Sequence, residues 1–268
     1  MDTSSPAVAN GAVYVASNDY NVYALNTTTG ALLWSYHNGS RYSSPAVANG
    51  VVYVGSDDNN VYALSASAGT KLWSYTTGNH VDSSPAVASG VVYVGSYDNK
   101  VYALNATTGG LLWSYTTGNH VDSSPAVANG VVYVASGDGH VYALQASTGA
   151  KLWRSKTNSA LQSSPAVANG VVYVGSGWDN NVYALNARTG AKLWSYTTGA
   201  GVTSSPAVAN GVVYVGSSDG SVYALNAKTG AKLWSYATGG FVWSSPAVSN
   251  GLVYVGSFDN KLYAFGLK

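Results

Sequence analysis

The chain has 268 residues, enough for one large all-β domain or two ordinary domains. Its 12 basic and 11 acidic residues leave a net charge of +1, which argues against nucleic acid as a partner, and no apolar run is long enough to predict insertion into a membrane. Cysteine is absent, which excludes disulfides, thiolate metal ligands and cysteine nucleophiles.

One motif divides the whole chain. The segment Ser-Ser-Pro-Ala-Val recurs seven times at intervals of 39 to 41 residues, with its prolines at Pro6, Pro45, Pro85, Pro125, Pro165, Pro206 and Pro246. Seven repeats, starting near residues 4, 43, 83, 123, 163, 204 and 244, therefore fill residues 1–268 as a single predicted domain.

The repeat that begins at Ser204 shows the elements expected in each. Asn210-Gly211 is the dipeptide that favours a two-residue type I′ hairpin, and further turns are expected around Asp219 and at Thr229-Gly230. No stretch has an apolar period of about 3.6 residues, so no helix is predicted. The four strands are expected at 205–209, 212–217, 222–226 and 233–236.

Four antiparallel strands repeated at this period are typical of a β-propeller. Val-Val-Tyr-Val and Val-Tyr-Ala-Leu are apolar on both strand faces, which fits sheets packed between neighbouring blades. Proline in the first strand fits one edge of the sheet, because proline has no N–H to donate to a neighbouring strand. Lysine at the start of the fourth strand fits the other edge, because charge there discourages pairing with another chain. These lysines are Lys71, Lys151, Lys192 and Lys232.

The seventh repeat ends before its fourth strand, and Met1–Thr3 is too short to supply one. We therefore predict an all-β, seven-bladed propeller of four-stranded antiparallel blades whose last blade lacks its outer strand. An open strand edge favours pairing with other chains, so we expect a monomer with a weak tendency to self-associate at the seventh blade. The chain as a fragment of a longer array is the alternative.

A second pattern carries a family resemblance. Ala24-x-Asn26-x-x-Thr29-Gly30-x-x-x-Trp34 resembles the tryptophan-docking repeat of PQQ-like, or quinoprotein-type, β-propellers, although the family usually has Asp at the position of Asn26. The resemblance implies that the tryptophan and the Thr-Gly turn lock adjacent blades together. It also implies a location at the cell surface or in the envelope, as for outer-membrane assembly lipoproteins and repetitive archaeal surface proteins. The docking tryptophans are Trp34, Trp73, Trp113, Trp153, Trp194 and Trp234.

Variation among the seven repeats is concentrated in two loops. One is the link between repeats, and the other is the turn between the second and third strands; in an up-and-down sheet both lie on one face. Loops on a rigid scaffold often carry function, and exposed aromatic rings suit sugars or peptide side chains, whereas unconstrained drift is the alternative. The candidate ligand-face residues are Tyr20, Arg41, Tyr42, His80, Asp82, Tyr97, His120, Asp122, Trp178, Phe241, Trp243 and Phe258.

Two groups of polar residues are candidate sites. His80, Asp82, His120 and Asp122 have side chains that bind Zn²⁺, but we expect equivalent positions on adjacent blades to be too far apart for that. A recurring aspartate in the strand two–three turn is expected to shape that turn rather than to bind a cation. These aspartates are Asp19, Asp58, Asp98, Asp138, Asp179, Asp219 and Asp259.

The sequence predicts a non-catalytic scaffold that binds a protein or glycan, with no cofactor and no metal. A structural, engineered or recently amplified propeller without an evolved ligand is the alternative. The resemblance also admits a quinone-dependent dehydrogenase, but those enzymes are longer and typically eight-bladed, with a Ca²⁺ site and often a vicinal disulfide. The absence of Cys and Glu, together with only seven repeats, disfavours that third hypothesis.

Overall fold

The computed structural model describes residues 4–267, and these form 27 strands. No helix is present among the described residues, as the sequence predicted, and none that could span a membrane was found there. Met1–Thr3, whose shortness entered the prediction about the seventh blade, lie outside the described residues.

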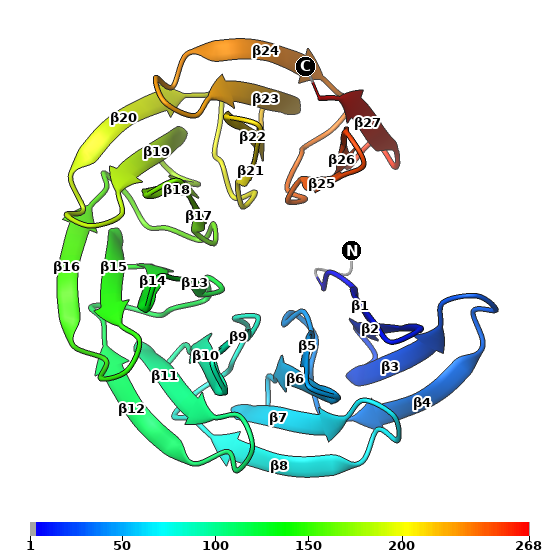
Figure 1. The fold of residues 1–268 in the computed structure, drawn as a ribbon. Coiled ribbons are helices and arrows are strands. Elements are labelled where there is room, and N and C mark those ends of the chain that lie inside the picture. Colours follow the sequence, from blue (N-terminus) through cyan, green and yellow to red (C-terminus); the bar gives the residue numbers. More distant parts are fainter. Residues whose placement is uncertain (1–3, 268) are drawn as a thin grey trace. The chain divides into compact units, whose positions relative to one another are not determined.

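Each of the first three repeats forms one four-stranded antiparallel sheet with the strands in chain order (Figure 1). The strands are β1 (Ala7–Ala9), β2 (Ala12–Ala16), β3 (Asn21–Asn26), β4 (Leu32–His37), β5 (Ala46–Ala48), β6 (Val51–Gly55), β7 (Asn60–Ser65), β8 (Lys71–Thr76), β9 (Ala86–Ala88), β10 (Val91–Gly95), β11 (Lys100–Asn105) and β12 (Leu111–Thr116).

The next three repeats form sheets of the same order, and the seventh forms the three-stranded sheet β25-β26-β27, as predicted. The strands are β13 (Ala126–Ala128), β14 (Val131–Ser136), β15 (His140–Gln145), β16 (Lys151–Lys156), β17 (Ala166–Ala168), β18 (Val171–Gly175), β19 (Asn181–Asn186), β20 (Lys192–Thr197), β21 (Ala207–Ala209), β22 (Val212–Gly216), β23 (Ser221–Asn226), β24 (Lys232–Ala237), β25 (Ala247–Ser249), β26 (Leu252–Gly256) and β27 (Leu262–Gly266).

The hairpin between β21 and β22 has the predicted turn. Asn210 and Gly211 both have positive φ, 49° and 74°, which is the type I′ conformation that matches the twist of the flanking strands. The prediction that Pro206 lies within the first strand is wrong, because β21 begins at Ala207. Proline has no N–H to donate to a sheet, so pairing begins after it.

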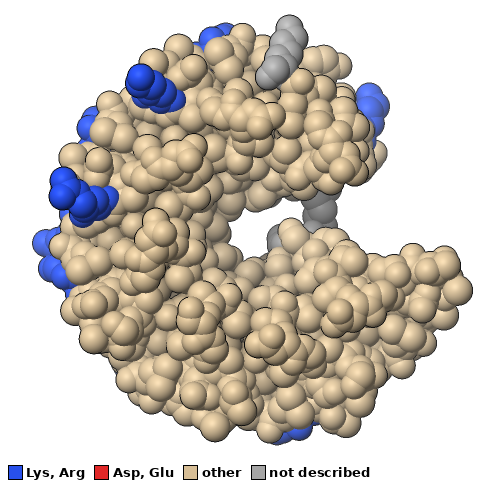
Figure 2. Space-filling model, in the orientation of Figure 1, with Lys and Arg blue, Asp and Glu red and all other residues tan. Residues whose placement is uncertain are grey.

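The first and fourth strands form the two edges of each four-stranded sheet. The prediction that lysine opens the fourth strand is confirmed at Lys71, Lys151, Lys192 and Lys232, where charge discourages edge pairing. Figure 2 shows basic side chains over the outer strands β16, β20 and β24, and no acidic side chain is visible on the face drawn there.

The contacts divide the chain into two compact units. The first unit contains the chain up to Val127 and the turn Ala146–Ala150, and the second contains the remainder. This turn contacts the first unit through Trp113, whose indole Nε1 donates a hydrogen bond to the carbonyl of Ala146 at 2.9 Å.

Each unit has a core of middle-strand side chains. In the first unit Val52, Val61 and Val92 are fully buried, and in the second unit Val182 and Val213 are. Consecutive residues of a strand point to opposite faces, and long stretches of the second and third strands are buried throughout. The middle strands are therefore covered on both faces, as their unbroken apolar sequences predicted.

Candidate ligand-binding face

Within each unit, the links between repeats lie against the turns between second and third strands. In the first unit, the Val81 N–H donates to the Ser56 carbonyl at 3.0 Å, and the Tyr97 N–H donates to the His80 carbonyl at 3.0 Å. In the second unit, the Phe258 N–H donates to the Phe241 carbonyl at 2.9 Å in the same way. Links and turns thus share one face of each unit, as the sequence predicted.

The central residue of a link is an anchor rather than part of the exposed surface. Val81 is 1% exposed, and Val121 and Val242 are fully buried. The link approaches so closely that a Cβ added to Gly55 would lie 2.3 Å from the carbonyl oxygen of Val81. Only the residues on either side of the anchor, together with the turn residue of the next repeat, are left to face a ligand.

In the first unit, the side chain of Tyr97 lies between two histidines. Its ring stacks on His120, with centroids 4.9 Å apart and planes at 11°, and meets His80 edge-on at 6.0 Å. The Nε2 atom of His120 lies 4.0 Å from Oδ2 of Asp122. The tyrosine therefore brings the histidines of two successive links into one cluster.

Carboxyl groups surround this cluster and perturb its titration. Burial, followed by the negative charges of Asp57 and Asp122, raises the pKa of Asp82 to about 6. Burial also raises the pKa of Asp122, whose Oδ1 atom is buried and has no hydrogen-bond partner among the described residues. The pKa of Tyr97 is raised to about 12 by burial and then by Asp122 and Asp82.

The zinc hypothesis gains no geometric support from this arrangement. Within residues 4–267, no three His, Cys, Asp or Glu side chains are grouped so as to hold a metal ion. The ring of Tyr97 occupies the space between His80 and His120. That these residues bind no metal stays a prediction.

Arg41 occupies the position of the buried anchor in the first link, since it stands four residues before Pro45, as Val81 does before Pro85. The first link therefore has a charged residue where the next link has a buried valine. The Nε atom of Arg41 lies 3.6 Å from Oδ2 of Asp57, and the Arg41 Cζ atom lies 4.3 Å from the centroid of the Tyr42 ring. The Tyr20 ring is 5.8 Å from the same guanidinium. Tyr20, Arg41 and Tyr42 are thus brought together by an ion pair and cation–π contacts.

In the second unit, the corresponding positions carry an aromatic cluster. The rings of Phe241 and Trp243 are parallel within 6° at 5.7 Å, and Phe258 meets Trp243 edge-on at 4.7 Å. Half of Phe241 and half of Trp243 remain exposed. The indole Nε1 of Trp243 donates to Oγ of Ser218 at 2.9 Å, which fixes its ring plane.

Trp178 lies apart from this cluster. It is 73% exposed, and it makes no ring contact with another aromatic side chain among the described residues. Of the twelve candidate residues, it is the one that the structure leaves most accessible to solvent.

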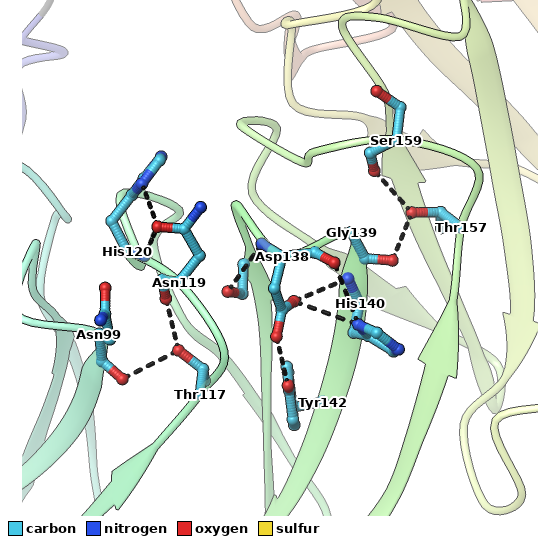
Figure 3. Close-up of polar contacts among 11 residues, drawn as sticks. Asn99, Thr117, Asn119, His120, Asp138, Gly139, His140, Tyr142, Thr157 and Ser159 are labelled. Carbon is cyan, nitrogen blue, oxygen red and sulfur yellow. Dashed lines mark hydrogen bonds and ion pairs between the residues drawn. The ribbon is translucent and has the colours of Figure 1, made fainter.

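Threonines at the ends of the fourth strands fix the links (Figure 3). The hydroxyl of Thr117 donates to the carbonyls of Asn99 and Asn119, at 2.9 and 2.6 Å. Thr157 makes the same pair of bonds to Gly139 and Ser159 in the second unit. The links that follow β12 and β16 are therefore held in place before any ligand binds.

The sequence matches a known family over most of its length. Residues 3–212 match the family described as the beta-propeller of the beta-alanine-activating enzyme. The chain belongs to this β-propeller family. Residues 178–268 of the propeller also match the family described as the outer membrane protein assembly factor BamB, whereas no curated protein matches the propeller by sequence.

Solved structures show the same fold. The propeller is similar to BamB from Moraxella catarrhalis, with a TM-score of 0.86 and 22% identity over 99% of this chain and 85% of that one. It is also similar to the computationally designed protein Ika8, with a TM-score of 0.71 and 18% identity over 98% of this chain and 95% of that one. The predicted PQQ-like propeller, with six four-stranded blades and a three-stranded seventh, is confirmed.

The tryptophans of the propeller dock as the resemblance implied. Trp73 donates from Nε1 to the Ala106 carbonyl at 3.0 Å, and a Cβ added to Gly109 would lie 2.7 Å from its ring. Trp34, Trp113, Trp153 and Trp194 make equivalent contacts with the next blade. Trp234 differs, because the three-stranded seventh blade has no such turn among the described residues; it packs on Phe265 at 5.2 Å instead.

The turn aspartates make one set of bonds that the sequence predicted and one that it did not. As predicted, Oδ1 of Asp58 accepts the Asn60 N–H at 3.0 Å and shapes the turn. In addition, Oδ2 of Asp58 accepts the Tyr62 hydroxyl at 2.6 Å. An Asp followed four residues later by Tyr occurs in all seven repeats, so this signal was available in the sequence.

Proposed function

We propose that this propeller is a non-catalytic interaction module that binds a protein partner through the face formed by its links and its strand two–three turns. The aromatic cluster of Phe241, Trp243 and Phe258 carries this proposal. A contiguous exposed group of large aromatic side chains is unusual on the surface of a soluble protein and typical of binding sites.

The geometry of the aromatic cluster supports a pre-organised site. Trp243 is fixed by its bond to Ser218 and by stacking on Phe241, so little side-chain entropy is lost when a ligand covers it. The first unit adds Arg41, Tyr42 and Tyr97 on its own link face, and these residue types are enriched in binding hot spots.

The relatives supply a second line of support. The family that matches residues 178–268 is named for an assembly factor of outer-membrane proteins, which is a role in protein handling. We extend this to a location in the cell envelope or at the cell surface. Detection of the native protein in the cytoplasmic fraction alone would contradict that part of the proposal.

The binding proposal is tested on peptide and glycan arrays with the purified propeller and a Trp243→Ala variant. We expect peptide binding that falls about tenfold or more in the variant, because truncating an aromatic hot spot removes most of its contact area. Leu233→Ala is the matched control, since Leu233 is 51% exposed but lies on the outer strand β24. Its binding should equal that of the wild type.

Other outcomes would replace the proposal. Binding to glycans alone would identify a lectin-type module, and no binding on either array would favour a propeller without an evolved ligand. The enzymatic alternative is tested by adding the quinone cofactor with candidate alcohol substrates. A cofactor-dependent spectral change and turnover would contradict the non-catalytic part.

A further inference from the structure

The second unit has its acidic and basic residues on opposite faces. Its links and strand two–three turns lie on one face, whereas its strand three–four turns lie on the other, beside the hairpins between first and second strands. The Ala187 N–H donates to the Gly170 carbonyl at 2.9 Å in the fifth blade, and the sixth blade repeats this bond between Ala227 and Gly211. Every acidic residue of the unit belongs to a strand two–three turn. These residues are Asp138, Asp179, Asp219 and Asp259.

Basic residues occupy the face formed by the strand three–four turns, which we call the basic face. Each one lies in such a turn or opens the fourth strand of its blade, and each is exposed. None of them forms an ion pair with a carboxylate among the described residues. They are Lys151, Arg188, Lys192, Lys228 and Lys232. The net charge of +1 therefore conceals a strongly positive face, and Figure 2 shows basic side chains but no acidic one on the face drawn there.

Exposed leucines accompany the lysines of the basic face. Lys151, Lys192 and Lys232 are each followed directly by a leucine that is about half exposed. These leucines are Leu152, Leu193 and Leu233. Association with an anionic bilayer is strengthened both by positive charge and by apolar area that enters the interface. Nucleic acid, in contrast, offers phosphates but no apolar layer that would cover the leucines, so the composition of this face favours a lipid surface.

A pocket on the basic face lies between the fifth and sixth blades. Its volume is about 470 Å³, and its lining includes Lys228 together with Asn169 and Asn210 from the hairpins of the two blades. The ammonium group of lysine and the amide groups of asparagine are hydrogen-bond donors that match the oxygens of a phosphate group. The pocket therefore provides a place for one phospholipid headgroup within a face whose other cations are spread over three blades.

We infer that the basic face of the second unit binds the surface of an anionic phospholipid bilayer. The cations lie against the lipid headgroups, the leucines contact the interface, and the pocket beside Lys228 holds one headgroup phosphate. The link face, with Phe241, Trp243 and Phe258, lies on the other side of the same unit and stays accessible to a protein partner. Because the two faces are separate, the inference does not depend on the proposed function.

The experiment measures sedimentation of the whole chain with phosphatidylcholine vesicles that contain about 30% phosphatidylglycerol. We expect saturable binding at low salt, no binding to pure phosphatidylcholine, and a loss of about tenfold or more when the salt is raised from about 0.05 M to about 0.5 M. The variant Arg188→Gln/Lys228→Gln/Lys232→Gln should bind about 100-fold more weakly, because each cation at an anionic bilayer surface contributes a factor of about five.

The matched control is Arg154→Gln/Lys156→Gln/Lys261→Gln, which removes three positive charges from outside the basic face. Arg154 lies in the middle of β16, Lys156 ends this strand next to a link, and Lys261 closes a strand two–three turn through the bond from the Ser257 N–H to its carbonyl. The control should bind anionic vesicles within about threefold of the wild type, since charges beyond a Debye length from the bilayer contribute little. Circular dichroism establishes that each variant is folded.

Leu193→Ser/Leu233→Ser tests the apolar contribution and should weaken vesicle binding by about fivefold or more. Equal losses in the two charge variants would overturn the inference, because net charge rather than one face would then govern binding. Absence of binding to anionic vesicles at low salt, or unchanged binding by the leucine variant, would overturn it as well. Tighter binding to a labelled DNA duplex than to the vesicles would identify nucleic acid as the partner of this face instead.

Discussion

The indole ring of Trp73 lies directly over Gly109 of the following blade. A Cβ built on this glycine would meet the ring at 2.7 Å, and its φ of +72° is in the left-handed region. Two independent constraints therefore require glycine at this position, and both arise from the way in which consecutive blades dock.

Gly109→Ala separates these constraints when it is compared with Gly30→Ala. Gly30 has a similar φ of +69°, but an added Cβ would have no atom within 4 Å. We expect Gly30→Ala to cost about 1–2 kcal/mol of unfolding free energy for backbone strain, and Gly109→Ala to cost about 1–3 kcal/mol more because of overpacking against Trp73. Urea unfolding measures the loss of unfolding free energy in both variants. Equal losses would contradict the overpacking argument, because they would show that the Trp73 ring moves aside without an energetic penalty.

The Ala106 carbonyl accepts two hydrogen bonds across a blade boundary, one from Nε1 of Trp73 at 3.0 Å and one from the Tyr53 hydroxyl at 3.1 Å. Tyr53→Phe alone leaves the carbonyl with one donor and should cost about 0.5–1.5 kcal/mol. Adding Trp73→Phe leaves this buried acceptor without either donor, so a double-mutant cycle should show a coupling of about 1 kcal/mol beyond additivity. Strict additivity would mean that water replaces the lost donors.

Asp98 connects a turn to the preceding link. Its Oδ2 atom accepts the Tyr102 hydroxyl at 2.5 Å and the Gly78 N–H at 2.8 Å, and Oδ1 accepts the Lys100 N–H at 3.1 Å. Asp98→Ala loses all three bonds and should destabilise the propeller by about 1–3 kcal/mol, whereas Tyr102→Phe loses one and should cost less. Thermal and urea unfolding rank the two variants, and the reverse order would contradict this account.

The raised pKa of Asp82 predicts a pH-dependent stability. Its folded-state pKa of about 6 lies above the ordinary value of 3.8, so the folded protein holds this proton more tightly than the unfolded chain does. Its contribution to stability therefore falls as the pH rises from about 4 to about 6, and the loss is complete above that. Asp57, Asp122, His80 and Arg41 are the charged or titratable groups that act on it.

Asp82→Asn should remove this penalty. We expect the melting temperature of the variant to rise relative to the wild type as the pH is increased from about 4 to about 7. Asp259→Asn is a control of opposite sign, because hydrogen bonding to Tyr263 lowers the pKa of Asp259 to about 2, below this range. Its effect should be destabilising and constant across the range, and a flat difference for Asp82→Asn would contradict the prediction.

The ligand-face tryptophans should contribute little to folding. Trp178 is 73% exposed and Trp243 is 49% exposed, so Trp178→Ala and Trp243→Ala should leave the melting temperature almost unchanged. Trp113→Ala, which removes a docking indole, should cost about 3–5 kcal/mol. Differential scanning calorimetry of the three variants tests this contrast between binding and docking residues.

The local elements could be read from the sequence, because each depends on a few adjacent residues. Asn210-Gly211 alone specifies a turn with two positive φ values. The seven copies of Ser-Ser-Pro-Ala-Val specify the number of sheets, because each copy begins a new one. The three-stranded seventh blade followed from counting strand segments. The docking role of Trp73 came from family resemblance, since its contact lies 33 residues further along the chain.

Only the tertiary structure decided which link residues act together. The sequence placed His80, Val81 and Asp82 in one variable loop, but the approach of the link to Gly55 buries Val81, while His80 is exposed and Asp82 is partly buried. The tertiary structure also places the ring of Tyr97 between His80 and His120, and it brings Phe258 into contact with Trp243. These relationships depend on how far each blade is rotated against the next, a quantity set by packing between sheets rather than by any short stretch of residues.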